Sequence, residues 1–410
     1  MAGLLEHRGY VRFWCADAVS MVGSSVTGLA LQVVAVVTLE ASGVELGILR
    51  AAQFLPYLLL GLIAGVIVDR HRRQPLLIGA DFARAVVLGL IPLGAAFDVL
   101  TLPLLIAVVL VFGTLSLAYD AAHQSFPPSL VPADLLTRAY ARMEQTSAVA
   151  QTAGPVFAGA LIKLLTAPLA ILVDAASYLL SGILLATVRP RTPEVAKGTD
   201  EPRNLRREIR DGLRWVYRSS TLGPLAITSH IWFVFQGLLT TVYVLFVLQT
   251  LGLSAFWLGV TYAFSGIGSI IGATASGWAG NRFGVGPAII ACRWLSPIAY
   301  LTAPLAGDDA LGIVLLCAGQ FVLGISLGID SPIELSYRQS ITPAGLLGRM
   351  NATMRSLNRA AIVVGAPLGG FLADQFGTRA ALWVGVGGMV VQAVLLNRSA
   401  FRHARLTASV

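Results

Sequence analysis

Charged residues are scarce in this sequence. Asp, Glu, Lys and Arg make up 12% of the 410 residues, whereas a soluble globular domain carries about a quarter. Hydrophobic residues make up 56%, and the mean hydropathy is +0.76. This composition excludes a soluble globular protein and indicates a polytopic membrane protein. Because one span needs about 20 apolar residues, the chain has room for roughly twelve spans and their loops.

Cysteine is also scarce, and motifs of cofactor chemistry are missing. The 3 cysteines are an odd number, with no CxxC pair and no neighbouring His, so neither a disulfide framework nor a metal site is predicted. No P-loop is present, so we do not expect direct ATP drive. The first apolar segment has no small-residue cleavage site behind a short core, and we expect it to stay attached.

The net charge of +8 and the pI near 9.7 describe a basic protein. Its arginines gather between apolar segments with little aromatic interleaving, a pattern that fits anionic lipid headgroups better than nucleic acid. We therefore expect the lipid bilayer as a partner and no nucleic acid.

The apolar segments predict helical spans separated by short loops. Successive loops would lie on alternate faces of the membrane, and Lys and Arg fall mostly in the loops of one face. Arg50, Lys163 and Arg379 are among the exceptions. The positive-inside bias then predicts a multi-pass protein of the cytoplasmic (plasma) membrane with both termini in the cytoplasm. The predicted spans are 11–38, 45–68, 75–97, 101–123, 138–163, 167–188, 221–250, 255–280, 286–306, 310–335, 348–373 and 379–397.

The end of the second predicted span carries the most distinctive pattern, GLIAGVIVDRHRR from Gly61 to Arg73. Gly61 and Gly65 lie at helical spacing and flatten one face for a close neighbour. Asp69 is placed to meet the positive end of another helix, and Arg73 to reach a carboxylate.

This pattern resembles the loop between spans two and three of the major facilitator superfamily. The resemblance implies a gate that holds the two halves together on the cytoplasmic side in the outward-open state. The alternative is an ordinary positive-inside cluster. The predicted gate residues are Gly61, Gly65, Asp69, Arg70, Arg73 and Asp120, the last of which ends the fourth span and is expected to pair with Arg73.

The chain also repeats itself. SLVPADLLTRAYAR from Ser129 is echoed by SITPAGLLGRMNATMR from Ser340. This duplication predicts two six-span bundles around a midplane site, the plan of rocking transporters. The expected fold is an all-α polytopic membrane protein with twelve transmembrane helices in two pseudo-symmetric bundles, the major facilitator fold. The expected domains are an N-terminal bundle (1–188), a cytoplasmic linker (189–220) and a C-terminal bundle (221–410).

The second part of the linker predicts an amphipathic helix, because Leu205, Ile209, Leu213 and Val216 share one face while arginines crowd the others. Two interpretations are open, a tether on the membrane surface or a site for a regulatory partner.

Glycine and proline recur in the fifth and eleventh spans and suggest hinges, since proline removes a backbone bond and glycine permits close sliding contact. The Gly-Pro pair resembles the antiporter signature of the superfamily's exporters, although a static kink is the alternative. The predicted hinge residues are Gly154, Pro155, Gly159, Gly365 and Pro367.

The order of segments is similar to one subfamily, the bacterial exporters that include the enterobactin exporter and macrolide efflux proteins. FWCADAVSMVGSSVTGLAL, GLIAGVIVDRHRR, SLVPADLLTRAYAR and LVDAASYLLSGIL carry the resemblance. Ser24 stands where many relatives have an acid, so no proton site is carried over to that position.

Charged side chains inside spans are costly, and each is a candidate for function until a partner accounts for it. Asp17 either binds a proton or a cationic substrate group, or caps and pairs locally. Glu144 lies deeper, where desolvation would favour proton uptake. Asp174 is expected to be structural. Asp81 and Arg84, one turn apart, are expected to pair with each other.

The second half holds further candidates. Asp330 and Glu334 are expected to pair with arginines, for which Arg282, Arg338 and Arg355 are the candidates. Arg359 either attracts an anionic substrate or neutralises an acid of another span. His230, Gln236 and Tyr243 of the seventh span either line a substrate cavity or pack at an interface.

These observations predict a secondary active transporter, not an enzyme. It would export a small organic molecule, such as a drug, siderophore or secondary metabolite, by proton antiport and alternating access. It would need no cofactor beyond the proton gradient and would work as a monomer. The alternatives are an importer or facilitator of the same fold, and a transport-inactive receptor or membrane enzyme. A lipid enzyme would need acidic clusters for magnesium, which only Asp308 and Asp309 approach.

Overall fold

The computed structural model describes residues 2–69, 71–190 and 205–404. The side chains of residues 2, 62–69, 133, 205, 206, 208 and 344 also lie outside the described part. Within these limits the chain forms helices and no strands, and 12 helices are long and apolar enough to cross a membrane. All the predicted spans are confirmed. The largest difference is in the tenth, predicted to end at 335 and observed to end at Ile341. The last turns of this helix are polar, so the apolar pattern ends before the helix does. The ion pair of Arg338 with Glu334, four residues apart, lies in these turns.

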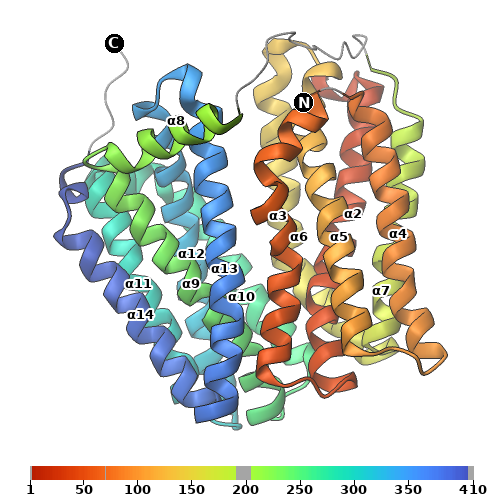
Figure 1. Cartoon of the computed structure of the whole chain (residues 1–410), viewed down its shortest axis with the longest axis vertical. Helices are drawn as coiled ribbons and strands as arrows, with labels where there is room; N and C mark the ends of the chain where they lie inside the picture. Colours follow the sequence, from red (N-terminus) through yellow and green to blue (C-terminus); the bar gives the residue numbers. More distant parts are fainter. Residues whose placement is uncertain (1, 70, 191–204, 405–410) are drawn as a thin grey trace. The chain divides into compact units, whose positions relative to one another are not determined.

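The described residues group into two units, each a bundle of helices (Figure 1). Unit 1 comprises Met1–Ala41 and Ala52–Glu201, and unit 2 comprises Ser42–Ala51 and Pro202–Val410. One helix, α3 (Gly43–Asp69), therefore has its first turns in unit 2 and its remainder in unit 1. The other long helices of unit 1 are α2 (Arg8–Val33), α4 (Arg73–Ala96), α5 (Leu102–Ser125), α6 (Leu136–Leu165) and α7 (Ala167–Ala186).

Unit 2 has a similar plan, but the helix before its first span is longer than the short α1 (Ala2–Leu5) of unit 1. The longer helix is α8 (Leu205–Arg218), and it contacts α9 and α13 (Figure 1). The long helices that follow are α9 (Leu222–Leu245), α10 (Ala255–Phe283), α11 (Val285–Leu305), α12 (Ala310–Ile341), α13 (Leu347–Phe376) and α14 (Thr378–Arg398).

The first spans of both units end in the same unusual way. α2 runs on into a π turn at Val34–Thr38, and α9 runs on into a π turn at Phe246–Thr250. In each, a backbone N–H bonds five residues back, from Leu39 to Val34 and from Leu251 to Phe246, both at 2.9 Å. The π turn is therefore a shared feature of the two units.

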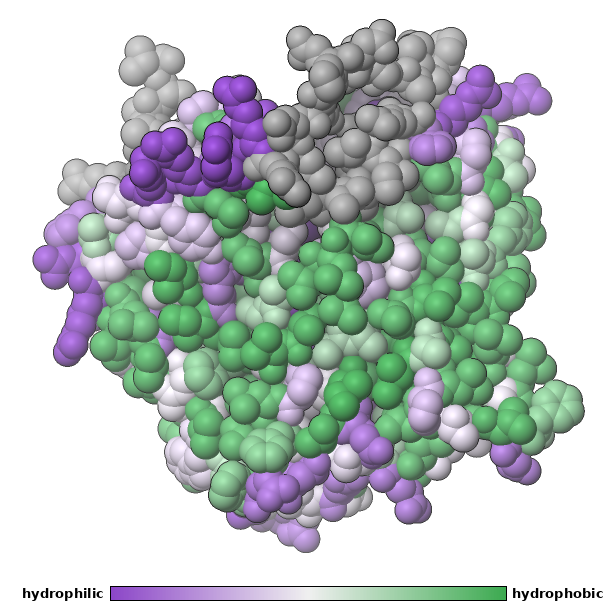
Figure 2. Space-filling model, in the orientation of Figure 1, coloured by the Kyte–Doolittle hydropathy of each residue, from purple (hydrophilic) through white to green (hydrophobic). Residues whose placement is uncertain are grey.

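Apolar side chains cover the sides of the helices. Figure 2 shows hydrophobic residues over the middle of the visible face and hydrophilic residues gathered towards the helix ends. Large apolar side chains such as Leu59, Val86 and Leu164 are 63%, 66% and 79% exposed. Soluble monomers rarely expose such a large apolar surface. This band matches the hydrocarbon core of a bilayer.

Helices inside unit 2 approach each other through glycine. A Cβ atom on Gly268 would lie 2.2 Å from the Phe321 carbonyl oxygen, and one on Gly328 would lie 2.2 Å from the Ser269 carbonyl oxygen. These positions belong to α10 and α12, whose backbones are too close for any side chain between them.

The predicted amphipathic helix is confirmed as α8, with a partly different buried face. Val216 is 0% exposed and joins the core of unit 2, whereas Leu213, which we predicted on the same face, is 37% exposed. Gly212 takes the central place instead, because a Cβ there would lie 2.7 Å from Thr353 Oγ1 of α13. Helix α8 thus belongs to the packing of unit 2. A groove of about 610 Å³ beside it is lined by Asp211, Arg214, Trp215, Arg218, Ser219, Ser220, Thr221, Ile341 and Leu346.

Candidate functional site

The predicted cytoplasmic gate is described only in part. The side chains of Gly65 and Asp69, and the whole of Arg70, lie outside the described residues. Gly61 lies in α3, and Arg73 is the first residue of α4. The contacts predicted for Asp69 therefore remain a prediction.

Asp120 has a different partner from the one we expected. The Tyr57 hydroxyl donates to Asp120 Oδ2 at 2.7 Å. Among the ion pairs of the described residues, none joins Asp120 to Arg73. Tyr57 lies about 18 Å before Asp69 along the axis of α3. Asp120 therefore meets α3 well inside its length, away from the loop where Arg73 begins α4.

Asp17 lies in a buried pair with a histidine that the sequence analysis missed. Its side chain is 4% exposed, and Asp17 Oδ1 lies 2.9 Å from His123 Nε2 of α5. The contact is an ion pair when His123 carries a proton, and His123 Nε2 is buried without a hydrogen-bond partner among the described residues. Of the two interpretations for Asp17, local pairing is present, but its partner is His123 rather than an arginine.

Aromatic rings hold this histidine in place. The His123 ring is stacked on Tyr119 with centroids 5.5 Å apart and is tilted against Phe13 with centroids 5.1 Å apart. Asp17 Oδ2 and the Tyr119 hydroxyl are buried without a hydrogen-bond partner among the described residues. The pair thus lies among aromatic rings, with one carboxylate oxygen of Asp17 left without a hydrogen bond.

Arg84 is the central cation of unit 1. It forms the predicted ion pair with Asp81, which is confirmed, and Asp81 also accepts a hydrogen bond from Ser181 at 2.7 Å. The guanidinium lies 3.9 Å from the ring centre of Tyr119 and 4.1 Å from that of Tyr178. Through Tyr119, this cation borders the ring that stacks on His123.

Asp174 and Glu144 differ in burial. Asp174 is 0% exposed and accepts from Ser177 at 3.0 Å, and it faces Gly23 closely. These contacts agree with a structural role. Glu144 is exposed, although we expected it to be desolvated. It lies in the third turn of α6, and the rotation of the helix about its axis, which the count of apolar residues does not reveal, leaves its side chain exposed.

The predicted hinge residues lie in unbroken helices. Pro155 is inside α6 and Pro367 inside α13. A Cβ atom on Gly154 would lie 2.4 Å from Ser25 Cβ, and one on Gly365 would lie 1.9 Å from a backbone oxygen of α9. Gly159 is buried in the same helix as Gly154. These glycines provide close helix approach, and a hinge motion remains a prediction.

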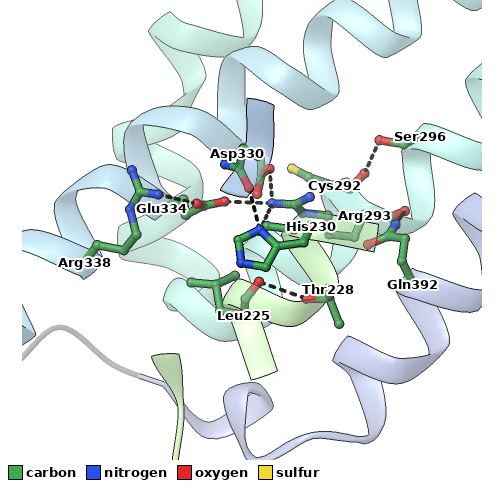
Figure 3. Close-up of polar contacts among 12 residues, drawn as sticks. Leu225, Thr228, His230, Cys292, Arg293, Ser296, Asp330, Glu334, Arg338 and Gln392 are labelled. Carbon is green, nitrogen blue, oxygen red and sulfur yellow. Dashed lines mark hydrogen bonds and ion pairs between the residues drawn. The ribbon is translucent and has the colours of Figure 1, made fainter. Parts of the chain in front are cut away.

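Unit 2 has its own buried charge cluster, centred on Arg293 of α11 (Figure 3). The guanidinium, in a residue 4% exposed, lies 3.1 Å from Asp330 Oδ2 and 2.7 Å from Glu334 Oε2. Glu334 also pairs with Arg338 at 3.1 Å, as one of the expected partners. The ring of Trp232 lies 5.7 Å away. We did not expect Arg293, although an arginine within the predicted span 286–306 was a visible signal.

The predicted cavity residues make different kinds of contact. His230 is held between Tyr217 and Asn358, each at 2.8 Å, which joins α9 to α8 and α13. These contacts agree with the packing interpretation. Tyr243 is 2% exposed, with its ring centre 5.8 Å from that of Tyr262.

Gln236 and Arg359, the other two predicted cavity residues, are half-buried. The Gln236 side-chain oxygen is buried without a hydrogen-bond partner in the described structure. It therefore has an unused acceptor, as a residue lining a substrate site would need.

The described part of the chain contains no group of three or more His, Cys, Asp or Glu side chains that could hold a metal ion. The paired bundles of membrane-spanning helices define a secondary transporter fold, and the family model of the Major Facilitator Superfamily matches residues 13–311 and 265–407. The chain belongs to this superfamily of membrane transporters, whose members carry small molecules.

Curated relatives cover almost the whole chain. Macrolide efflux protein A of Streptococcus pyogenes is 22% identical over 371 residues, 90% of either chain. The uncharacterised transporter YfiS of Bacillus subtilis, of the same superfamily, is 25% identical over 402 residues, covering 92% of this chain and 90% of that protein.

Solved structures share the fold. The nucleoside transporter NupG aligns with a TM-score of 0.74 at 12% identity, over 97% of this chain and 100% of that chain. A bacterial homologue of the iron transporter ferroportin in an inward-facing state aligns with a TM-score of 0.75 at 15% identity, over 97% of this chain and 99% of that chain.

Proposed function

We propose that this transporter exports a small amphipathic organic molecule from the cytoplasm in exchange for protons. It would lie in the cell membrane with both termini cytoplasmic and work as a monomer, with the Gly61–Arg73 loop as the cytoplasmic gate. The observation that carries the proposal is the buried pair of Asp17 and His123, 2.9 Å apart.

The direction of transport is supported by the relatives. Macrolide efflux protein A is named for export, and its likeness to this chain extends over 90% of both sequences. Sidedness is supported by the arginines of α8, which belong to a loop of the side that is rich in basic residues.

The chemistry of the pair suits a proton carrier. When Asp17 and His123 share one proton, the pair is neutral or zwitterionic, and a second proton would make it cationic. A second proton would change the net charge of a site inside the membrane-spanning helices, and such a change can be tied to a change of conformation. Of the titratable groups near the pair, Tyr10 and Tyr119 interact electrostatically with Asp17, and Asp81 interacts with His123. Arg84 lies over the Tyr119 ring.

Transport into energised inside-out vesicles tests the proposal. In such vesicles, export appears as uptake of a fluorescent dye or macrolide, and a protonophore should abolish it. Asp17→Asn and His123→Gln each remove one member of the pair, and both should reduce uptake to the level seen with protonophore. Asp134→Asn is the matched control, because it removes an exposed acid that lies in a connecting turn.

Two outcomes would redirect the assignment. If Glu144→Gln uncoupled transport while Asp17→Asn did not, the carrier would be Glu144. If substrate entered right-side-out vesicles down the proton gradient instead, the importer alternative would replace export.

A further inference from the structure

The start of α3 is capped twice. Locally, Ser42 and Glu45 form a capping box, in which Glu45 Oε2 accepts from the Ser42 N–H at 2.8 Å and the Ser42 hydroxyl lies 3.3 Å from the Glu45 N–H. The second cap comes from α13. The carboxylate of Asp374 accepts from the Gly43 N–H at 2.7 Å and from the Val44 N–H at 2.9 Å.

The second cap uses donors that the first leaves free. The first four N–H groups of a helix have no partner within it, and a carboxylate there is favoured by the positive helix end. Asp374 takes the N–H groups of Gly43 and Val44 with one oxygen each. Its side chain is exposed, so water can replace it when the two helices part.

Next to the cap, the backbones of α3 and α13 approach each other closely at two glycines of α3. A Cβ atom on Gly43 would lie 2.6 Å from the Gly370 carbonyl oxygen, and one on Gly47 would lie 2.5 Å from the Ala366 carbonyl oxygen. At these two positions no side chain lies between the backbones, so none has to be repacked there when the helices part. The Asp374 carboxylate adds two directional hydrogen bonds at the end of this seam.

The sequence around Asp374 repeats a pattern from the other end of α3. Gly370 and Asp374 have the spacing of Gly65 and Asp69, and each aspartate lies at or near the end of its helix. Helix α3 is about 40 Å long. Its capped start and Asp69 therefore lie at opposite faces of the membrane.

We propose that Asp374 is the latch of the face opposite the Gly61–Arg73 loop. It holds the first turns of α3 on α13, and these turns leave α13 when the carboxylate releases them. The idea rests on the proposed transport cycle, since only alternating access requires this seam to open. Asp374 would be a positioning residue that sets the balance between two conformations and does not touch substrate.

Distance measurements between two spin labels test the latch without any transport assay. The labels would replace Ile48 of α3 and Gln375 of α13, both exposed, after Cys15, Cys292 and Cys317 are changed to Ala. Asp374→Ala should raise the ratio of long to short distances about two- to fivefold, the effect expected of one charge at a helix end. Asp374→Asn, which keeps one acceptor, should lie between.

Glu45→Ala is the matched control. It removes a carboxylate from the same helix start but leaves α13 untouched, so the distance distribution should stay as in the unchanged chain. Equal distributions for Asp374→Ala and the unchanged chain would overturn the latch. So would an equal shift in Glu45→Ala, because the cause would then be fraying of α3. If the labels respond as expected but no proton-driven uptake is found, the proposed function fails and the latch stands.

Discussion

Removing Arg293 should destabilise unit 2 more than removing any surface charge. The guanidinium faces the two carboxylates of Asp330 and Glu334 at 3.1 and 2.7 Å, and all three residues lie largely out of solvent. Arg293→Met keeps much of the side-chain volume but leaves both acids without this partner. Breaking a buried ion pair from one side costs about 3–5 kcal/mol. Because Glu334 keeps Arg338, most of the cost should fall on Asp330.

The unfolding temperature of the purified protein in detergent measures this cost. For a unit of this size, about 2–4 °C is lost per kcal/mol, so Arg293→Met should lower the midpoint by about 10 °C. Arg338→Met is the control, because Glu334 still has Arg293 when Arg338 is gone. Arg338→Met thus leaves no carboxylate without a partner and should lower the midpoint less than Arg293→Met does.

A double variant separates charge from packing. Arg293→Met with Asp330→Asn has no unpaired charge at Asp330, and it should recover most of the lost temperature. The reasoning would be refuted if Arg293→Met unfolded within about 2 °C of the unchanged protein, or if the added Asp330→Asn lowered the midpoint further.

Three further outcomes are expected. Gly365→Ala should lower the unfolding temperature, at a cost of about 1–3 kcal/mol for overpacking, whereas Gly387→Ala, with open space around it, should raise stability by about 0.5–1 kcal/mol. Ser181→Ala removes a donor from buried Asp81 and should cost about 2 kcal/mol in the same assay. Desolvation raises the pKa of Tyr217 in the folded protein. The contribution of Tyr217 to stability is therefore fully present below the ordinary tyrosine pKa of about 10, and it is lost as the pH rises through the higher pKa of the folded state. Tyr217→Phe should therefore flatten the fall in unfolding temperature from about pH 9 to 11.

The spans could be predicted from sequence because their signal is local. An apolar run of about 20 residues is sufficient evidence for a membrane helix, and the bounds found for α2 to α7 and for α9 to α14 follow from such runs. The pair of Asp81 and Arg84 was equally accessible, since residues three apart share a helix face.

Partners from other helices were not accessible in this way. Asp17 pairs with His123 of α5, and Arg293 pairs with two acids of α12, and no spacing along the chain encodes either contact. The exposure of Glu144 and of Leu213 depends on how each helix is rotated about its axis. Amphipathic patterning gives that angle only to within about a third of a turn.

The matching π turns after α2 and α9 bear on the history of the chain. A π turn is a helical turn that accommodates a surplus residue, and such turns are rare. Two independent insertions at corresponding places are a less economical account than one insertion inherited twice. The ancestral half-length gene would then already have encoded this irregularity before it was copied, and both descendants have kept it while their sequences diverged.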